Sequence, residues 1–370
     1  MSKFSKTVCG IIAAILTVCL CALIVFLACS AMFSGFFNGS DIFICFVGIA
    51  IAFYATVIIH EAGHLIFGRI SGYSFSSFRI GSLMLVRQNG KLRLRRMSIA
   101  GTGGQCLMLP PEPENGHIPV ILYNLGGVVA NVVLCILFGL GYFLFLKYIV
   151  VAYVFLIGTI ISMIFAVTNG IPLDVGGIAN DGMNAIYLSK DSSSAVAFRN
   201  QLLMNAAQTE GMRISQMPDE WFAIPDNADP QNLHIASIAV FKASRALDRG
   251  DTKAAEQEIG SLLNSRFNVI GLHRSLLTCD LIYCRLINKS GEVDHLLSKG
   301  QRKFMSAMKD YPSVLRTEYA IALLVDSDSK KAEKIMAQFD RRGRAFPYQQ
   351  EISAERELML GALDIYKRNV

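Results

Sequence analysis

The chain has 370 residues, of which 52% are hydrophobic and 17% are charged, and its formal net charge is +6. A mean hydropathy of +0.41 excludes an ordinary soluble protein. The apolar residues are concentrated before residue 190, whereas the rest of the chain has ordinary charged patterning and no apolar run of spanning length. The sequence therefore predicts a mainly α membrane domain over residues 1–190, followed by a soluble domain.

Four segments are each near or above the roughly 20 apolar residues that a helix needs to cross a bilayer. They are residues 8–33, 42–68, 118–146 and 149–168. The first is predicted to be a retained span rather than a signal peptide, because its apolar run is long and no small-residue cleavage site follows it. The lipid bilayer is thus one expected partner.

The connection between the second and third segments, residues 71–117, is rich in arginine and lysine and poor in acidic residues. The positive-inside rule places such a loop in the cytoplasm. With four spans, both termini are then cytoplasmic, in a multi-pass protein suited to the bacterial cytoplasmic membrane. The positive net charge is an orientation signal, and no nucleic-acid partner is predicted.

Within this loop, residues 83–88 and 91–95 flank the dipeptide Asn89-Gly90. Asn-Gly favours a type I′ turn between two strands, so a β-hairpin is predicted. Two roles are open for it. A sheet edge can hold an extended substrate strand by main-chain hydrogen bonds, and a basic hairpin can rest on anionic lipid.

The second apolar segment contains an H-E-x-x-H motif at residues 60–64. On a helix, His60 and His64 share a face and can bind one metal ion, while Glu61 stays close enough to act on a water molecule. Ionisable groups inside a membrane span are costly and tend to be functional. The motif predicts a hydrolase with one Zn²⁺ per chain, and the competing interpretation is a polar patch satisfied by neighbouring helices.

A catalytic zinc ion usually has three protein ligands and an open fourth position, so two histidines leave one ligand to be found. Asp174 and Asp181 follow the fourth apolar segment, and both are candidates. In the third segment, Asn131 needs a partner within lipid. It could bond another helix, or a substrate backbone held near the metal.

Three ordered motifs make residues 42–190 resemble the site-2 protease family of intramembrane zinc metalloproteases, in particular its bacterial branch. They are the H-E-x-x-H motif, the glycine-rich third segment ending in Asn131, and Asn-Gly-Ile-Pro at 169–172 followed by an Asp-Gly. The resemblance implies that the two histidines and the later aspartate hold zinc and that Glu61 is the catalytic base. It also suggests Asn131 and Asn169 as substrate-positioning residues.

The chain departs from this family at the third ligand. The usual Leu-Asp-Gly would match Leu173-Asp174, but Val175 intervenes before the glycine, whereas Asp181-Gly182 is an intact Asp-Gly at a longer spacing. We favour Asp181 as the ligand, with Asp174 as the alternative, because the glycine suits a tight turn that aims the carboxylate. Either aspartate could instead cap the helix that begins near Gly182.

Residues 191–230 are predicted to be a linker, because prolines recur in it. Residues 231–370 are helical in pattern, with breaks at intervals of roughly 40 residues, near the period of helical-hairpin repeats. Residues 246–255 look like a tetratricopeptide turn. A cytoplasmic, tetratricopeptide-like domain is therefore predicted, and such a domain can bind a protein partner.

Together these features predict an intramembrane zinc metalloprotease that cleaves a membrane-anchored protein or peptide in or near its span, in regulated proteolysis or signal-peptide processing. The alternative is a non-catalytic membrane scaffold, in which a degenerate protease fold holds a partner through the helical-repeat domain. Zinc content discriminates between the two.

Overall fold

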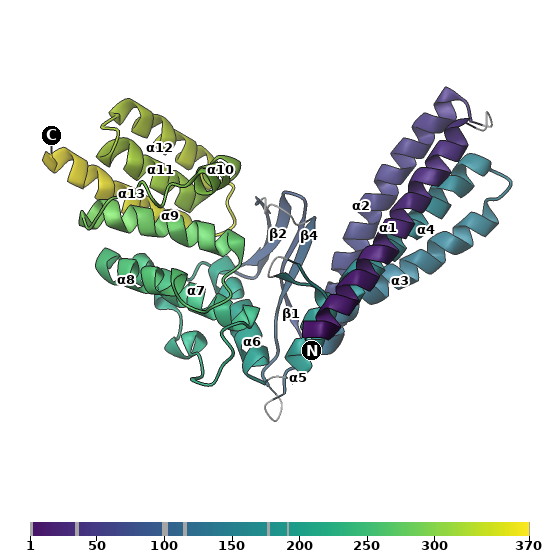
Figure 1. Cartoon of the computed structure of the whole chain (residues 1–370), viewed down its shortest axis with the longest axis horizontal. Coiled ribbons are helices and arrows are strands. Elements are labelled where there is room, and N and C mark those ends of the chain that lie inside the picture. Colours follow the sequence, from purple (N-terminus) through teal and green to yellow (C-terminus); the bar gives the residue numbers. More distant parts are fainter. Residues whose placement is uncertain are drawn as a thin grey trace. The chain divides into compact units, whose positions relative to one another are not determined.

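The computed structural model describes residues 3–33, 37–97, 103–113, 117–175, 178–190 and 192–369. The chain divides into two compact units. The first unit comprises residues 1–81 and 100–195, and the second comprises residues 82–99 and 196–370. Figure 1 shows the long helices of the first unit and the shorter helices of the second.

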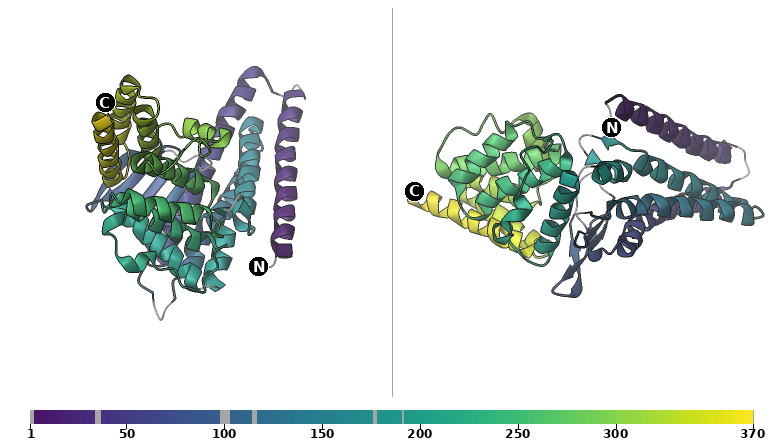
Figure 2. Two further views of the ribbon diagram at one scale, coloured as in Figure 1. Left: turned by 60° about the vertical axis from the view of Figure 1, so that its left-hand side comes forward. Right: turned by 90° about the horizontal axis from the view of Figure 1, so that it is seen from below.

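The first unit is built from α1 (Lys3–Phe33), α2 (Gly39–Ile70), α3 (Val120–Leu144) and α4 (Ile149–Gly170). These four helices are long and apolar enough to cross a membrane, as predicted. α2, α3 and α4 pack against one another, and α1 lies along α4 (Figures 1 and 2).

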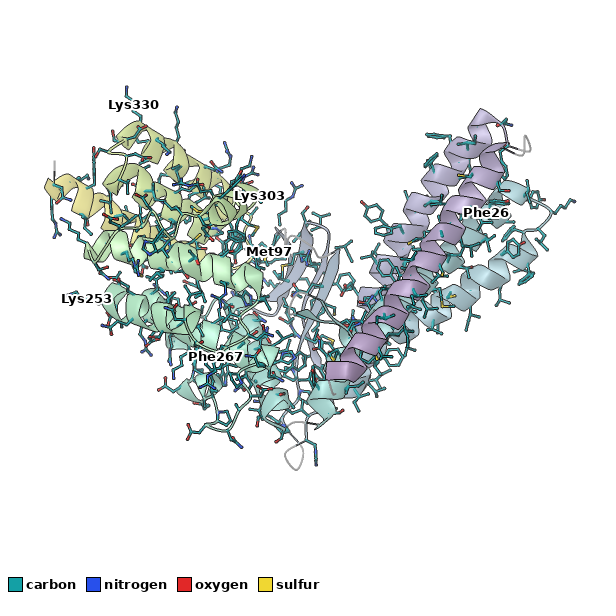
Figure 3. The ribbon with its side chains drawn as sticks, in the orientation of Figure 1. Phe26, Met97, Lys253, Phe267, Lys303 and Lys330 are labelled. Carbon is teal, nitrogen blue, oxygen red and sulfur yellow. The ribbon has the colours of Figure 1, made fainter. Side chains whose placement is uncertain are left out.

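The surfaces of the two units differ in polarity. Large apolar side chains point outward from the long helices; Phe26, labelled in Figure 3, is 67% exposed and Phe143 is 69% exposed. The second unit instead carries exposed charged residues such as Lys253, Lys303 and Lys330 (Figure 3). A contiguous apolar surface is unfavourable in water and is suited to lipid. The four helices therefore have both the length and the surface of membrane spans.

Helices α2 and α3 approach each other at two facing glycines. A Cβ atom on Gly63 would lie 2.3 Å from the carbonyl oxygen of Gly126, and a Cβ on Gly126 would lie 2.5 Å from that of Gly63. Small residues allow such close crossing of helices in lipid. This contact brings the backbone of α3 up to the helix that carries the H-E-x-x-H motif.

Two strands of the first unit lie beside α2. β1 (Ser74–Ile80) pairs with β4 (Gly104–Leu109) in an antiparallel ladder, and β4 packs on α2. The sequence did not predict these strands, because β1 is rich in serine and β4 begins at a glycine. Burial of alternate residues in β4, and of three residues in β1, outweighs these weak local preferences.

The predicted hairpin is present in the second unit. β2 (Leu83–Gln88) pairs with β3 (Lys91–Arg96), and the connecting Asn89 and Gly90 both have positive φ angles, of 51° and 71°. A type I′ turn requires this geometry, and Asn-Gly adopts it easily. Most residues of β3 are exposed, so both roles expected for the hairpin remain predictions.

The helices of the second unit pack mainly against helices one or two places away in the chain. They are α7 (Leu233–Asp248), α8 (Thr252–Leu263), α9 (Gly271–Asn288), α10 (Lys299–Ala307), α11 (Pro312–Leu324), α12 (Ser329–Gly343) and α13 (Gln349–Asn369). α8 lies between α7 and α9, and α11 contacts α9, α12 and α13. Helical pairs stacked along the chain suit a repeat domain, and a specifically tetratricopeptide-like fold remains a prediction.

Residues 191–230 are not an irregular linker. They contain α6 (Ser192–Thr209) and two short 3-10 helices, η1 (Ile214–Gln216) and η2 (Asp219–Phe222). Met204 and Phe222 share a buried cluster with Ile235 and Ile238 of α7. The prolines interrupt the helices of this segment, but burial of its apolar residues keeps it part of the folded unit.

Candidate metal centre

The H-E-x-x-H motif lies in the last turns of α2. His60 and His64 are one turn apart on the same face of the helix, and each is less than a tenth exposed. Their Nε2 atoms are 3.2 Å apart. Asp181, the first residue of α5 (Asp181–Lys190), places its Oδ2 atom 3.2 Å from Nε2 of His60 and 3.4 Å from Nε2 of His64.

These three atoms form a triangle that fits a single metal ion. Tetrahedral coordination with metal–ligand distances of about 2.0–2.1 Å places neighbouring ligand atoms about 3.3 Å apart. The three observed distances, 3.2, 3.2 and 3.4 Å, agree with that value. The group formed by His60, His64 and Asp181 could therefore hold one metal ion, as predicted.

The outer ring nitrogens of both histidines contact polar groups of α3. Nδ1 of His64 is 2.8 Å from the carbonyl oxygen of Tyr123, which can only accept, so Nδ1 carries the hydrogen and donates it. Nδ2 of Asn131 is 2.9 Å from Nδ1 of His60, and the Oδ1 atom of this amide is buried without a hydrogen-bond partner among the described residues. A turn of the amide by 180° would let Oδ1 accept a hydrogen from Nδ1 of His60.

Both Nε2 atoms face the carboxylate of Asp181. The Oδ2 atom of Asp181 is buried, and among the described residues its polar neighbours in the site are these two Nε2 atoms. Where both rings are neutral and carry their hydrogen on Nδ1, three electron-pair donors face one another and repel, and a cation among them would remove that repulsion. The donor set of two imidazoles and one carboxylate is typical of catalytic zinc.

Glu61 is buried beside this group and lies against strand β4. A Cβ atom on Gly104 would lie 2.5 Å from its Oε1 atom, so the backbone of β4 occupies the space next to the carboxyl group. β4 is also held from the other side, because the Tyr123 hydroxyl donates to the Cys106 carbonyl over 2.9 Å. Glu61 is thereby confined next to the two histidines.

A glycine of α3 lines the histidine side of the site. A Cβ atom on Gly127 would lie 2.6 Å from Cε1 of His60 and 2.6 Å from Nε2 of His64. The two rings therefore pack directly on the backbone of α3, which limits their rotation. Gly127 of the glycine-rich third span thus packs on the site itself.

Asp181 does not cap its own helix. The side chain of Asn180 accepts the Met183 N–H over 3.0 Å, which is the N-cap bond of α5. A Cβ on Gly182 would lie 2.1 Å from the carbonyl oxygen of Gly170. The glycine of the Asp-Gly pair thus permits close packing of α5 on the end of α4, rather than the tight turn expected from the sequence.

The remaining predicted site residues lie in different surroundings. The side chain of Asp174 is outside the described residues; its backbone belongs to strand β5 (Asp174–Val175), which pairs with β6 (Ile178–Ala179). The Asn169 amide donates to the Phe165 carbonyl of its own helix over 2.9 Å, and its role with substrate remains a prediction. Asn131 contacts the candidate metal ligand His60, and its role with substrate also remains a prediction.

Sequence reasoning missed Tyr123 and Asn180. Tyr123 orients His64 through its backbone carbonyl, for which no side-chain signal exists. Asn180 precedes the Asp-Gly pair and is a common N-cap residue, which was a usable signal.

Comparison of the chain with protein-family models, with curated proteins and with solved structures finds no match. The function is therefore inferred from the residues of the site and their geometry.

Proposed function

We propose that this protein is an intramembrane zinc metalloprotease that hydrolyses peptide bonds in or near the span of a membrane-anchored protein or peptide. The observation that carries the proposal is the triangle of His60, His64 and Asp181 donor atoms, with edges of 3.2, 3.2 and 3.4 Å, beside the buried Glu61. The histidines and the glutamate lie on a helix that is long and apolar enough to cross a membrane.

His60, His64 and Asp181 would hold a zinc ion, whose Lewis acidity would activate water and polarise a carbonyl group. Glu61 then accepts a proton from the attacking water and delivers it to the amine that leaves. The Tyr123 carbonyl holds His64 in the tautomer that presents Nε2, and Asn131 contacts the outer nitrogen of His60. Burial of these residues keeps bulk water out and strengthens their electrostatic interactions.

The proposed substrate class follows from the location of the site. His60 and Glu61 lie within α2, so a scissile bond reaches them from within or next to the bilayer. The basic loop 71–117 favours a cytoplasmic position for the end of α2 that carries the motif, and for both termini. We propose the second unit as a cytoplasmic domain that binds a protein partner.

The test combines metal analysis with a search for accumulating substrates. We expect near-equimolar zinc in detergent-purified wild type and in Glu61→Gln, and loss of zinc in His64→Ala. Quantitative proteomics of membranes from cells that carry Glu61→Gln should show membrane-anchored proteins that wild type removes.

Each negative result has a separate meaning. Wild type without zinc, and without uptake of added zinc, would contradict the metal site. Zinc retention with no protein accumulating in Glu61→Gln cells would contradict proteolysis and favour the scaffold alternative.

A further inference from the structure

The metal ligand Asp181 lies between two contacts that join α5 to the end of α4. One is the packing of Gly182 on Gly170 described above. The other is made by the side chain of Asn180, which forms four hydrogen bonds. Its Nδ2 atom donates to the carbonyls of Thr168 (2.7 Å) and Ile171 (2.6 Å), and its Oδ1 atom accepts from the N–H groups of Leu173 and Met183 (both 3.0 Å).

The first two bonds satisfy carbonyls that the broken helix leaves open. In a continuing helix, the Thr168 carbonyl would accept the N–H of residue 172, but this residue is Pro172, which has none. The Asn180 amide supplies the missing donor. One side chain, that of Asn180, therefore joins the end of α4 to the start of α5.

The other two bonds fix the start of α5. The bond from the Met183 N–H is the N-cap bond, and the bond from the Leu173 N–H joins α5 to the segment after α4. A backbone bond, in which the Asn180 N–H donates to the Leu173 carbonyl over 3.0 Å, adds to this second contact. One planar amide with two donors and two acceptor positions meets all four partners. Serine could keep the cap bond but not the two donations, and aspartate would place negative oxygens against two carbonyls.

We propose that Asn180 is the positioning residue for Asp181: it clamps α5 to the broken end of α4 so that the Asp181 carboxylate meets both histidines. The inference rests on the proposed metal site. Asp181 follows Asn180 directly, so a shift of α5 that opens the clamp moves Oδ2 away from the two Nε2 atoms. Metal sites tolerate displacements of about 0.2 Å.

The test measures Zn²⁺ affinity of the full-length protein in detergent, by competition with a chromophoric chelator. We expect Asn180→Ala and Asn180→Ser both to bind Zn²⁺ about 10- to 100-fold more weakly than wild type, as loss of an outer partner of a ligand usually does. The matched control is Asn124→Ala, which removes a buried amide whose donation, among the described residues, goes to the Val120 carbonyl of its own helix. Its affinity should equal that of wild type.

Substitution with Co²⁺ gives a second readout. Loss of Asp181 from the coordination sphere should lower the intensity of the visible absorption bands in both Asn180 variants, whereas a general loss of stability would not change the spectrum of the folded fraction. Wild-type affinity in Asn180→Ala would overturn the inference, as would full rescue by Asn180→Ser, which would reduce Asn180 to a helix cap. Wild type that binds neither metal would instead overturn the metal site itself.

Discussion

Gly127 offers a direct test of how closely α3 packs on the two histidines of the candidate metal centre. An alanine there would place its Cβ 2.6 Å from His60 Cε1 and from His64 Nε2. Ordinary contacts between such atoms are about 3.5 Å, so the rings must move by about 0.9 Å. That displacement exceeds the roughly 0.2 Å that a metal site tolerates. We expect Gly127→Ala to weaken Zn²⁺ binding by about 10-fold or more, or about 1.4 kcal/mol.

The matched control lies on the same helix. Gly139 has no atom within 4 Å of the position of an added Cβ, so Gly139→Ala should bind zinc as wild type does. Both substitutions raise helix propensity by about 1 kcal/mol, so neither should unfold α3 on local grounds. Affinity is read by chelator competition, with circular dichroism to follow helix content. Equal affinity in Gly127→Ala and Gly139→Ala would refute the packing argument.

Three further outcomes are expected. Gly104→Ala, whose Cβ would lie 2.5 Å from Glu61 Oε1, should keep zinc and lose at least about 10-fold in cleavage, measured on the proteins that accumulate in Glu61→Gln cells. Arg316→Met should destabilise the second unit by about 3–5 kcal/mol in denaturant titrations followed by Trp221 fluorescence, because the buried guanidinium pairs with Asp280 and Glu355. Burial raises the pKa of Glu355 to about 7, although Arg316 opposes the shift. The folded state therefore holds a proton that the unfolded chain has lost, and this stabilisation disappears as pH rises through 7. Stability should fall by about 1 kcal/mol between pH 6.5 and 8, and Glu355→Gln should reduce this dependence.

The parts of the fold that the sequence predicted are those with strong local signals. The four apolar segments are long enough to be recognised by length alone, and Asn89-Gly90 marks its hairpin because few other pairs adopt two positive φ angles. The two histidines were placed correctly because helical geometry fixes residues four apart on one face. These signals do not depend on distant parts of the chain.

Local signals could not decide which aspartate lies beside the two histidines. Asp174 and Asp181 are both acidic residues after a helix break, and the choice depends on where α5 begins and against what it packs. That depends on the four bonds of Asn180 and on the contact of Gly182 with Gly170, which join residues up to 12 positions apart. Likewise, α6 is stabilised by burial against α7. Its own residues carry no strong helical signal, so the prolines that follow it favoured the prediction of a linker.

The glycines at this site have a different structural role from the one that local sequence suggests. A run of glycines indicates a loop or a turn, yet three of the glycines described here let a backbone approach a reactive side chain or the helix that carries one. Gly127 meets both histidines, Gly104 meets Glu61, and Gly182 brings the helix of Asp181 onto α4. Backbone moves less than a side chain does, so a site enclosed in this way holds its ligand atoms at fixed distances. The contacts of Gly127 and Gly182 thus act on the edges of the donor triangle, and the contact of Gly104 acts on Glu61 beside it.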